Sequence, residues 1–206
     1  MTNIRVSCAS LARITLDDKF LLGLNHDKLR RKGISVFTPY GGVLAFYEPA
    51  RPLLAFLGAI FEKAGSDDLR LTLPEENLPA FETWFSARTH RESDPYRELV
   101  EEFVEEEGIL PDLRRTNVTL DYLTTATERV PTNKPGQEGV LTQRYLEIYN
   151  TKFIPEYEQL IREDLSQPDT HLGLLTEREL RTGRSDTGIE IGTNCLPLIV
   201  RGEQYG

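Results

Sequence analysis

The sequence predicts an α/β protein in which two or three helices accompany a mixed β-sheet. Short segments of alternating apolar residues predict strands along much of the chain, beginning with Val6 to Leu16. Apolar residues at helical spacing predict amphipathic helices, most clearly between Asp94 and Gly108. A strand ending in two glycines, Phe37 to Gly42, comes before that helix. This order of elements fits an α/β/α sandwich around a mixed sheet.

The N-terminal strands are predicted from the alternation of apolar and polar residues and from the turn residues between them. Val6 to Leu16 and Phe20 to Leu24 predict two strands of a hairpin, joined by a turn at Asp17 to Lys19. Asn25 to Gly33 is expected to be a polar loop, followed by a strand from Ser35 to Thr38. The basic residues of the loop either stay solvated or form an electropositive flap for phosphates: Lys28, Arg30, Arg31 and Lys32.

The middle of the chain is rich in apolar residues that are expected to be core. Pro52 to Ala64 predicts a helix, Asp68 to Leu73 a strand, and Leu78 to Phe85 a short helix. Arg70 and Arg91 flank these elements. Each of the two arginines either reaches a substrate or pairs with nearby acids, and Arg70 is kept as a candidate ligand-binding residue.

The C-terminal third predicts further strands and one capped helix. Thr176 and Glu179 have the spacing of a capping box, so a helix should begin there. The acids Glu177 and Glu179 also have the chemistry of a general base, although capping alone explains Glu179. The expected strands are Thr116 to Thr124, Leu141 to Tyr149, Thr170 to Leu175 and Gly188 to Gly192.

The segment from Asp94 to Gly108 carries the strongest functional signal. Asp94 suits the N-cap, Pro95 the first helical position and Gly108 the residue past the end, which predicts a helix of about three turns. With roughly 100° per residue, the apolar and acidic residues fall on opposite faces. The apolar face holds Tyr96, Leu99, Val100 and Phe103, and the acidic face holds Glu98, Glu101, Glu102 and Glu105.

The acidic face predicts a site for a hard cation. Between Glu92 and Glu107 there are eight acidic residues and one basic residue, Arg97, within a chain of net charge −9. Like charges one turn apart cost about 0.2–0.5 kcal/mol each, so an ordinary solvated face normally intersperses lysine or arginine. Carboxylate oxygens on a rigid helix suit Mg²⁺. A solvated acidic face remains the alternative.

Length and composition limit the classes of protein to which this chain is expected to belong. Its 206 residues are expected to form a single domain, residues 1–206. The negative charge disfavours general nucleic-acid binding and anionic membranes, which need a basic surface. No apolar run is long enough for a membrane span, and the N-terminus lacks a signal-peptide core, so a cytoplasmic location is expected. Cys8 and Cys195 are expected to be buried thiols, and the three histidines receive no role.

The R-E-L-V-E-E run at residues 97–102 resembles the core of the Nudix box, G-x5-E-x7-R-E-U-x-E-E-x-G-U, where U is a bulky apolar residue. The resemblance implies that Glu98, Glu101 and Glu102 bind Mg²⁺ or Mn²⁺ and that Arg97 braces them. In this register Val104 stands where the box has glycine, and two upstream positions are threonines. Sliding the box four residues recovers Gly108 but loses the arginine. We favour the Arg97 register, and Glu102 is a ligand in both.

Further features resemble one divergent Nudix branch. Pro39 to Gly42 is similar to the P-x-G-G strand end that precedes the box, which makes Gly41 and Gly42 candidates for close approach to a ligand. About fifty residues separate this motif from the helix, so residues 43–90 are read as an insertion. That spacing resembles the SMODS-associated branch, found beside bacterial second-messenger and antiviral-defence genes.

The resemblance implies a Nudix fold and a Mg²⁺- or Mn²⁺-dependent hydrolase of nucleoside diphosphate-linked compounds. The simplest such reaction splits a nucleoside triphosphate into monophosphate and pyrophosphate. The alternatives are a non-catalytic sensor of a nucleotide signal and a scaffold whose acidic helix contacts a basic partner. The expected partner is a nucleotide or a nucleoside diphosphate-linked small molecule, and a homodimer is left open.

Overall fold

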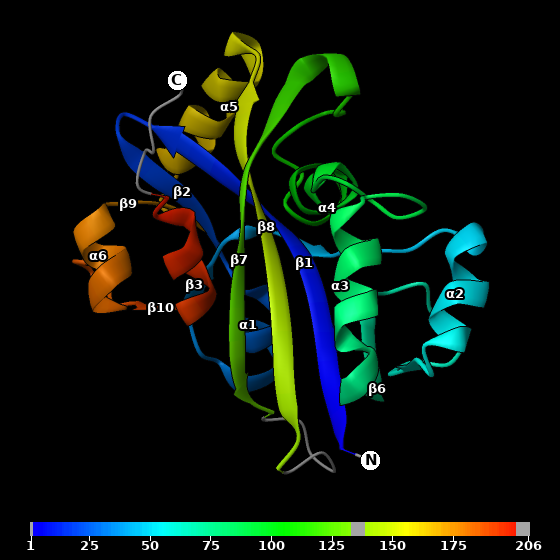
Figure 1. Cartoon of the computed structure of the whole chain (residues 1–206). Helices are drawn as coiled ribbons and strands as arrows, with labels where there is room; N and C mark the ends of the chain where they lie inside the picture. Colours follow the sequence, from blue (N-terminus) through cyan, green and yellow to red (C-terminus); the bar gives the residue numbers. More distant parts are fainter. Residues whose placement is uncertain (1, 133–138, 201–206) are drawn as a thin grey trace. The chain divides into compact units, whose positions relative to one another are not determined.

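The computed structural model describes residues 2–132 and 139–200 (Figure 1). The chain forms two compact units. The first unit comprises Met1–Ser10, Gly42–Pro95 and Thr125–Glu147, and the second comprises Leu11–Gly41, Tyr96–Thr124 and Ile148–Gly206. The expected insertion, residues 43–90, lies within the first unit.

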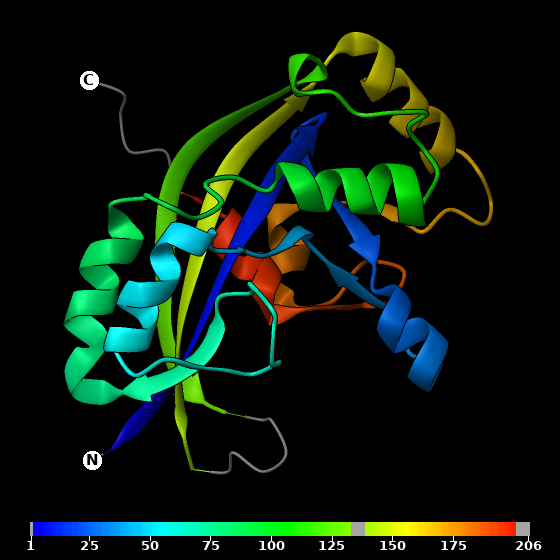
Figure 2. The same cartoon turned by 90° about the vertical axis from the view of Figure 1, so that its right-hand side faces the viewer.

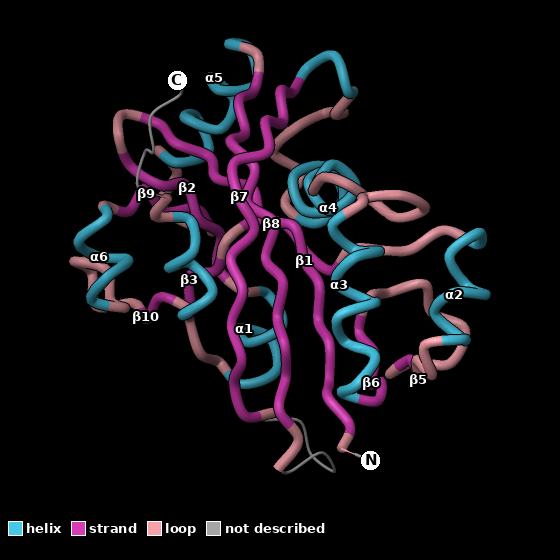
Figure 3. The backbone as a smooth tube through the Cα atoms, viewed as in Figure 1, coloured by secondary structure: helices cyan, strands magenta, loops and turns pink. Residues whose placement is uncertain are grey.

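The described residues form a mixed α/β structure, as the sequence predicts (Figure 3). The sheet is mixed because β3 and β10 pair in parallel whereas β1 and β2 pair antiparallel. The strands are β1 (Asn3–Leu16), β2 (Lys19–Leu24), β3 (Val36–Thr38), β4 (Tyr40–Val43), β5 (Ile60–Phe61), β6 (Arg70–Pro74), β7 (Val118–Pro131), β8 (Leu141–Phe153), β9 (Leu172–Leu175) and β10 (Glu190–Ile191). The α-helices are α1 (His26–Lys32), α2 (Arg51–Phe56), α3 (Leu78–Ser86), α4 (Tyr96–Val100), α5 (Pro155–Leu165) and α6 (Glu177–Thr182).

The first unit has its own apolar core. The start of β1 pairs antiparallel with β6, from Asn3 opposite Pro74 to Ser7 opposite Arg70, and β6 pairs with β5. The two α-helices of this unit, α2 and α3, are drawn in cyan and green in Figure 2. Each of them contributes buried residues to the core. The buried core residues are Ile4, Val6, Cys8, Leu44, Phe46, Ala50, Leu54, Leu57, Leu69, Leu71, Leu73, Leu78, Phe81, Trp84, Phe85 and Tyr145.

One helix of the first unit is shorter than predicted. The expected helix over residues 52–64 ends at Phe56, because Gly58 has a φ of 74° and turns the chain into β5. A left-handed φ suits glycine and ends a helix. The predicted helix over residues 78–85 is confirmed as α3, whose aromatic residues are buried.

Arg91 pairs with an acid in the core of the first unit. Its guanidinium nitrogens lie 2.8 and 3.3 Å from the two carboxylate oxygens of Glu147. Neither side chain is more than 2% exposed. The same guanidinium donates to the carbonyl oxygens of Phe85 and Glu92 and stacks over the Phe85 ring. The sequence left two roles open for Arg91, contact with a substrate and pairing with a nearby acid. The structure shows that Arg91 pairs with an acid.

The second unit begins with the predicted hairpin. Leu16 stands opposite Lys19, and the two turn residues Asp17 and Asp18 have φ angles of 51° and 59°. Two consecutive positive φ values are what a tight hairpin turn requires. From β2 the pairing continues to β3 and to β9, both antiparallel, and from β3 to β10.

The apolar face of the acidic helix lies in the core of the second unit. Leu99 and Phe103 are both fully buried, as predicted, and Tyr96 and Val100 pack against them at the edge. Helix α5 adds Tyr157 and Ile161. In the part of the chain that the structure describes, no helix is long and apolar enough to cross a bilayer.

The predicted polar loop at residues 25–33 is wrong, because this segment is helix α1. The side chain of Asn25 accepts a hydrogen bond from the Lys28 N–H, 2.8 Å away, and caps the first turn. Gly33 ends the helix with a φ of 63°. An asparagine N-cap followed by a left-handed glycine is a sequence signal for a short helix.

Candidate functional site

The acidic helix is present where predicted, but only its first part is a regular α-helix. It starts as α4 (Tyr96–Val100) and continues as a π-helical segment, Glu101–Glu106. Gly108 follows with a φ of 65°. A π-helix bonds residue i to i+5 and is found frequently at functional sites.

The π-helical geometry brings Glu107 onto the same face as Glu102. The backbone N–H of Glu107 donates to the carbonyl oxygen of Glu102 at 2.9 Å, which is an i to i+5 bond. In a regular α-helix Glu107 would point roughly 140° away from Glu102. The wider turn therefore adds a carboxylate that helical periodicity does not assign to this face.

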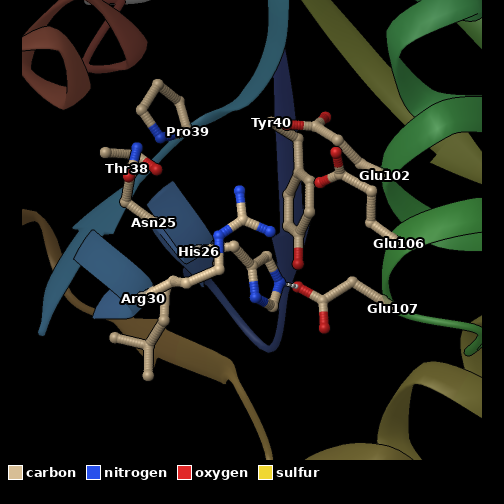
Figure 4. Close-up of a pocket in the computed structure, with 11 residues that line it drawn as sticks. Asn25, His26, Arg30, Thr38, Pro39, Tyr40, Glu102, Glu106 and Glu107 are labelled. Carbon is tan, nitrogen blue, oxygen red and sulfur yellow. Dashed lines mark hydrogen bonds and ion pairs between the residues drawn. The ribbon is translucent and has the colours of Figure 1, made fainter. Parts of the chain in front are cut away.

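A pocket of about 440 Å³ opens beside this face within the second unit (Figure 4). Glu102, Glu106 and Glu107 project from the helix toward side chains of α1 and of the β3–β4 segment. The lining residues are Gly23, Leu24, Asn25, His26, Arg30, Thr38, Pro39, Tyr40, Glu102, Glu106 and Glu107.

Glu102 is held at the pocket by the glycine motif. Its Oε2 accepts a hydrogen bond of 2.8 Å from the backbone N–H of Gly41. Gly41 has a φ of 109°, a conformation that a side chain would strain. The two motifs singled out in the sequence, the P-x-G-G strand end and the acidic helix, therefore meet through this bond.

The electrostatics around Glu102 favour a bound cation. Burial is the largest reason that the pKa of Glu102 is raised well above its usual range, with the Gly41 hydrogen bond acting in the opposite direction. Neighbouring negative charges raise the pKa further, namely those of Glu98, Glu106 and Glu107. A carboxylate in these surroundings is costly to ionise unless positive charge is placed beside it.

Arg97 makes the contacts expected of a bracing residue. Its guanidinium lies 2.8 Å from Glu98 Oε1 and 3.0 Å from Glu101 Oε1. Glu98 is the better shielded of the two acids, with a side chain 20% exposed against 43% for Glu101. Arg97 thus orients Glu98 one helical turn before Glu102.

Tyr40 lines the pocket, and its hydroxyl is buried. The residue is only 3% exposed, and its hydroxyl has no hydrogen-bond partner among the residues that the structure describes. Burial raises the pKa of Tyr40 well above its usual range, with the charge of Glu107 as the next contribution, so the hydroxyl keeps its proton. A buried donor without a partner costs stability and suits a site where a ligand supplies the acceptor.

The family model of the SMODS-associated NUDIX domain matches residues 3–199 of this chain. The chain belongs to that family. The match covers both compact units and confirms the resemblance drawn from the acidic helix and the P-x-G-G motif.

Two other comparisons add little to the family assignment. No curated protein matches the chain. Among solved structures, the chain is similar to the solution structure of the E. coli ORF135 protein, with 12% sequence identity, a TM-score of 0.37, and coverage of 95% of this chain and 86% of that chain.

The donor set of this NUDIX domain fits the divalent cation that its family implies. Glu102 and Glu98 offer carboxylate oxygens on successive turns of one helix, and the local field is negative. Oxygen ligands of this kind are those preferred by Mg²⁺ and Mn²⁺. A cation beside Glu102 would lower the pKa of its carboxyl group, which burial and the neighbouring acids raise.

Of the predicted site residues, Glu102 alone is among those that line the pocket in the described part of the chain. Gly41 contacts Glu102 without being part of the lining, and Arg97 pairs with Glu98 and with the half-exposed Glu101 outside it. Gly42 follows Gly41 in β4, and Arg70 is exposed on β6 in the first unit. Of the basic residues at 28–32, only Arg30 lines the pocket. Glu179 forms the predicted capping box with Thr176, and this confirms its structural role.

The sequence assigned no role to three residues at or next to the pocket. Tyr40 and His26 line it, and His171 contacts the lining residues His26 and Glu107. Tyr40 lies inside the P-x-G-G motif, so its position was an available signal. His26 and His171 come together only through strand pairing. Because Gly23 of β2 stands opposite Leu172 of β9, the backbone oxygen of His171 accepts from the Leu24 N–H at 2.8 Å.

Proposed function

We propose that this NUDIX domain is a Mg²⁺- or Mn²⁺-dependent hydrolase of nucleoside diphosphate-linked compounds, acting most simply on nucleoside triphosphates to give monophosphate and pyrophosphate. One observation carries the proposal. Glu102 is fixed by Gly41 at the wall of a pocket, among carboxylates that raise its pKa, and the same pocket is lined by Tyr40, whose hydroxyl has no partner among the described residues. A cation and a phosphate chain would satisfy both groups.

Each residue at the site has a role that its contacts support. Glu102, at the pocket wall, and Glu98, one turn earlier on the same helix, would hold the cation, which would supply positive charge for the phosphates and a bound water of lowered pKa. Gly41 fixes the Glu102 carboxylate, and Tyr40 donates a hydrogen bond to a substrate oxygen. Arg30 contributes positive charge at the opposite wall of the pocket, where it attracts the phosphates. The protein thus acts by positioning and by charge neutralisation.

Calorimetric titration with a panel of nucleotides in Mg²⁺ and in Mn²⁺ tests the proposal. At least one ligand should give a continuing heat of hydrolysis, together with released pyrophosphate or phosphate, and EDTA should abolish both. Tight binding with every ligand recovered intact would exclude the hydrolase and leave a sensor.

The two registers of the box predict opposite orders of damage. In the Arg97 register, Glu98→Gln should lower kcat by about a hundredfold, whereas Glu106→Gln should change it only mildly. Glu98 has the largest electrostatic effect on Glu102 of the three neighbouring acids, and Arg97 fixes its position. Glu106 is exposed, although it lines the pocket. Steady-state rates of the two variants in the reverse order would support the register that starts four residues later.

A specific observation favours a second candidate function, a non-catalytic sensor of a nucleotide. Arg97 pairs with both Glu98 and Glu101, and Glu102 is the one acid of the R-E-L-V-E-E run among the residues that line the pocket. A site with a single available box acid could bind a nucleotide without turning it over. The calorimetric titration distinguishes the two functions.

A further inference from the structure

Two histidines and one glutamate converge at the end of the acidic helix. His26 Nε2 lies 2.8 Å from Oε1 of Glu107, and His171 Nδ1 lies 3.6 Å from Oε2 of the same carboxylate. The two imidazole rings stand edge to face, with centroids 4.9 Å apart. One donor atom from each residue lies within 4.8 Å of the other two. We propose that His26, Glu107 and His171 bind a divalent transition-metal ion, such as Zn²⁺ or Co²⁺.

The donor atoms identify the class of metal. Imidazole nitrogen suits zinc, iron, copper and nickel, whereas Mg²⁺ and Ca²⁺ prefer sites built only of oxygen. Two histidines with one carboxylate make up the protein ligands of some catalytic zinc sites and of non-haem iron sites, both of which keep open positions. The set therefore differs in chemistry from the oxygen ligands Glu98 and Glu102, and it would select a different ion.

The spacing of the donors suits a single ion. Ligand atoms at about 2.0–2.1 Å from a tetrahedral Zn²⁺ stand roughly 3.3 Å apart. His26 lies 2.8 Å from Oε1 of Glu107 and His171 lies 3.6 Å from its Oε2, and one ligand atom from each of the three residues lies within 4.8 Å of the others. Side-chain rotations that shorten the longest of these distances would place one ion between the three groups.

The backbone holds the three residues in place independently of a ligand. His26 begins α1 directly after the cap Asn25, and His171 is fixed by the pairing of β2 with β9. Glu107 is turned to this position by the π-helical segment. Secondary structure from three separate parts of the second unit thus converges on one point.

A hydrogen-bonded cluster without a metal is the competing arrangement, and the surroundings argue against it. Glu107 is 9% exposed, yet His26 and His171 are 34% and 42% exposed, so an ion can enter between them. The same pocket contains the acids Glu102 and Glu106 and the unpartnered hydroxyl of Tyr40. Excess negative charge attracts a cation, and the hydroxyl can donate to a water or ligand oxygen in an open coordination position.

The inference is independent of the proposed hydrolase. It rests on the histidines, which the Mg²⁺ proposal does not use, and it holds equally for a catalytic or a sensing protein. A metal at this position would lie in the same pocket as Glu102. It would thereby add a second positive charge for an anionic ligand.

Titration of the metal-stripped full chain, prepared without a histidine tag, with Co²⁺ tests the site. We expect one equivalent of Co²⁺ to give visible absorption bands that Zn²⁺ abolishes by competition. His171→Ala and Glu107→Gln should each weaken binding at least tenfold, because even outer partners of metal ligands are worth about 10–100-fold. Excess Mg²⁺ should not displace the Co²⁺.

Matched variants establish which side chains bind the Co²⁺. His90→Asn removes the remaining histidine and should leave the Co²⁺ bands unchanged, since asparagine tolerates the φ of 58° found there. Glu102→Gln should also retain the bands while impairing Mg²⁺-dependent turnover. Circular dichroism confirms that each variant is folded. Absence of bands in the wild type, or their persistence in a folded His26→Ala/His171→Ala protein, would overturn the proposal.

Discussion

Replacing Glu102 with glutamine should lower turnover by at least about a hundredfold and should also stabilise the metal-free protein. The two effects have one cause, since the negative charge that would hold a cation is unfavourable without it. Burial and three neighbouring acids raise the pKa of Glu102 above its unfolded value. The stability that this shift contributes is therefore present at pH values below the unfolded pKa and is lost as the pH rises through the raised pKa of the folded state.

Glutamine keeps the shape and still accepts the Gly41 hydrogen bond. In EDTA at neutral pH, the unfolding temperature of Glu102→Gln should therefore rise by a few degrees, given roughly 2–4 °C for each kcal/mol in a chain of this size. The stabilisation that Mg²⁺ and a nucleotide confer on the wild type should be largely absent in the variant. Glu156→Gln makes the same chemical change on an exposed position of α5 and should leave turnover unchanged, whereas it should lower the unfolding temperature slightly, because it removes a negative charge from the first helical turn. Normal turnover of the Glu102→Gln variant would show that Glu102 is not a ligand of the metal.

The hairpin and the apolar face of the acidic helix could be predicted because local rules determine them. Two consecutive aspartates between alternating segments specified the β1–β2 turn, and Leu99 and Phe103 followed from helical spacing. Helix α5 was missed, although it begins with Pro155 and buries Tyr157 and Ile161 four positions apart. Two buried residues on a single short helix give too weak a period to stand out among polar neighbours.

Only those parts of the candidate site that are formed by contiguous residues could be predicted from the sequence. The R-E-L-V-E-E run and the P-x-G-G motif are contiguous, so Glu102 and Gly41 were both named, and their hydrogen bond joins them. The position of Glu107 depends on a π-helical turn that a period of 3.6 residues cannot reveal. The histidines depend on the register of β2 against β9, which sets long-range contacts that no short pattern contains.

Breaking the buried pair of Arg91 and Glu147 should have the largest effect on stability. Arg91→Met removes a guanidinium that contacts both oxygens of a carboxylate that is 2% exposed, while Arg88, whose side chain is 30% exposed, stays 3.1 Å away. Loss of one member of a buried pair costs about 3–5 kcal/mol, because the remaining charge stays desolvated. Urea unfolding followed by circular dichroism should show this loss as a lower transition midpoint.

An exposed pair provides the matched control. Arg162 contacts Asp17 at 2.6 Å, but its side chain is 38% exposed, so Arg162→Met should cost no more than about 1 kcal/mol. The double variant Arg91→Met/Glu147→Leu removes both buried charges and should recover part of the lost stability. Recovery of stability will be incomplete, because Arg91 also donates a hydrogen bond to the carbonyl oxygen of Phe85. If Arg91→Met is too unstable to purify, a soluble double variant still shows that an uncompensated charge was the cause. Equal losses in Arg91→Met and Arg162→Met would instead show that burial adds nothing to this ion pair.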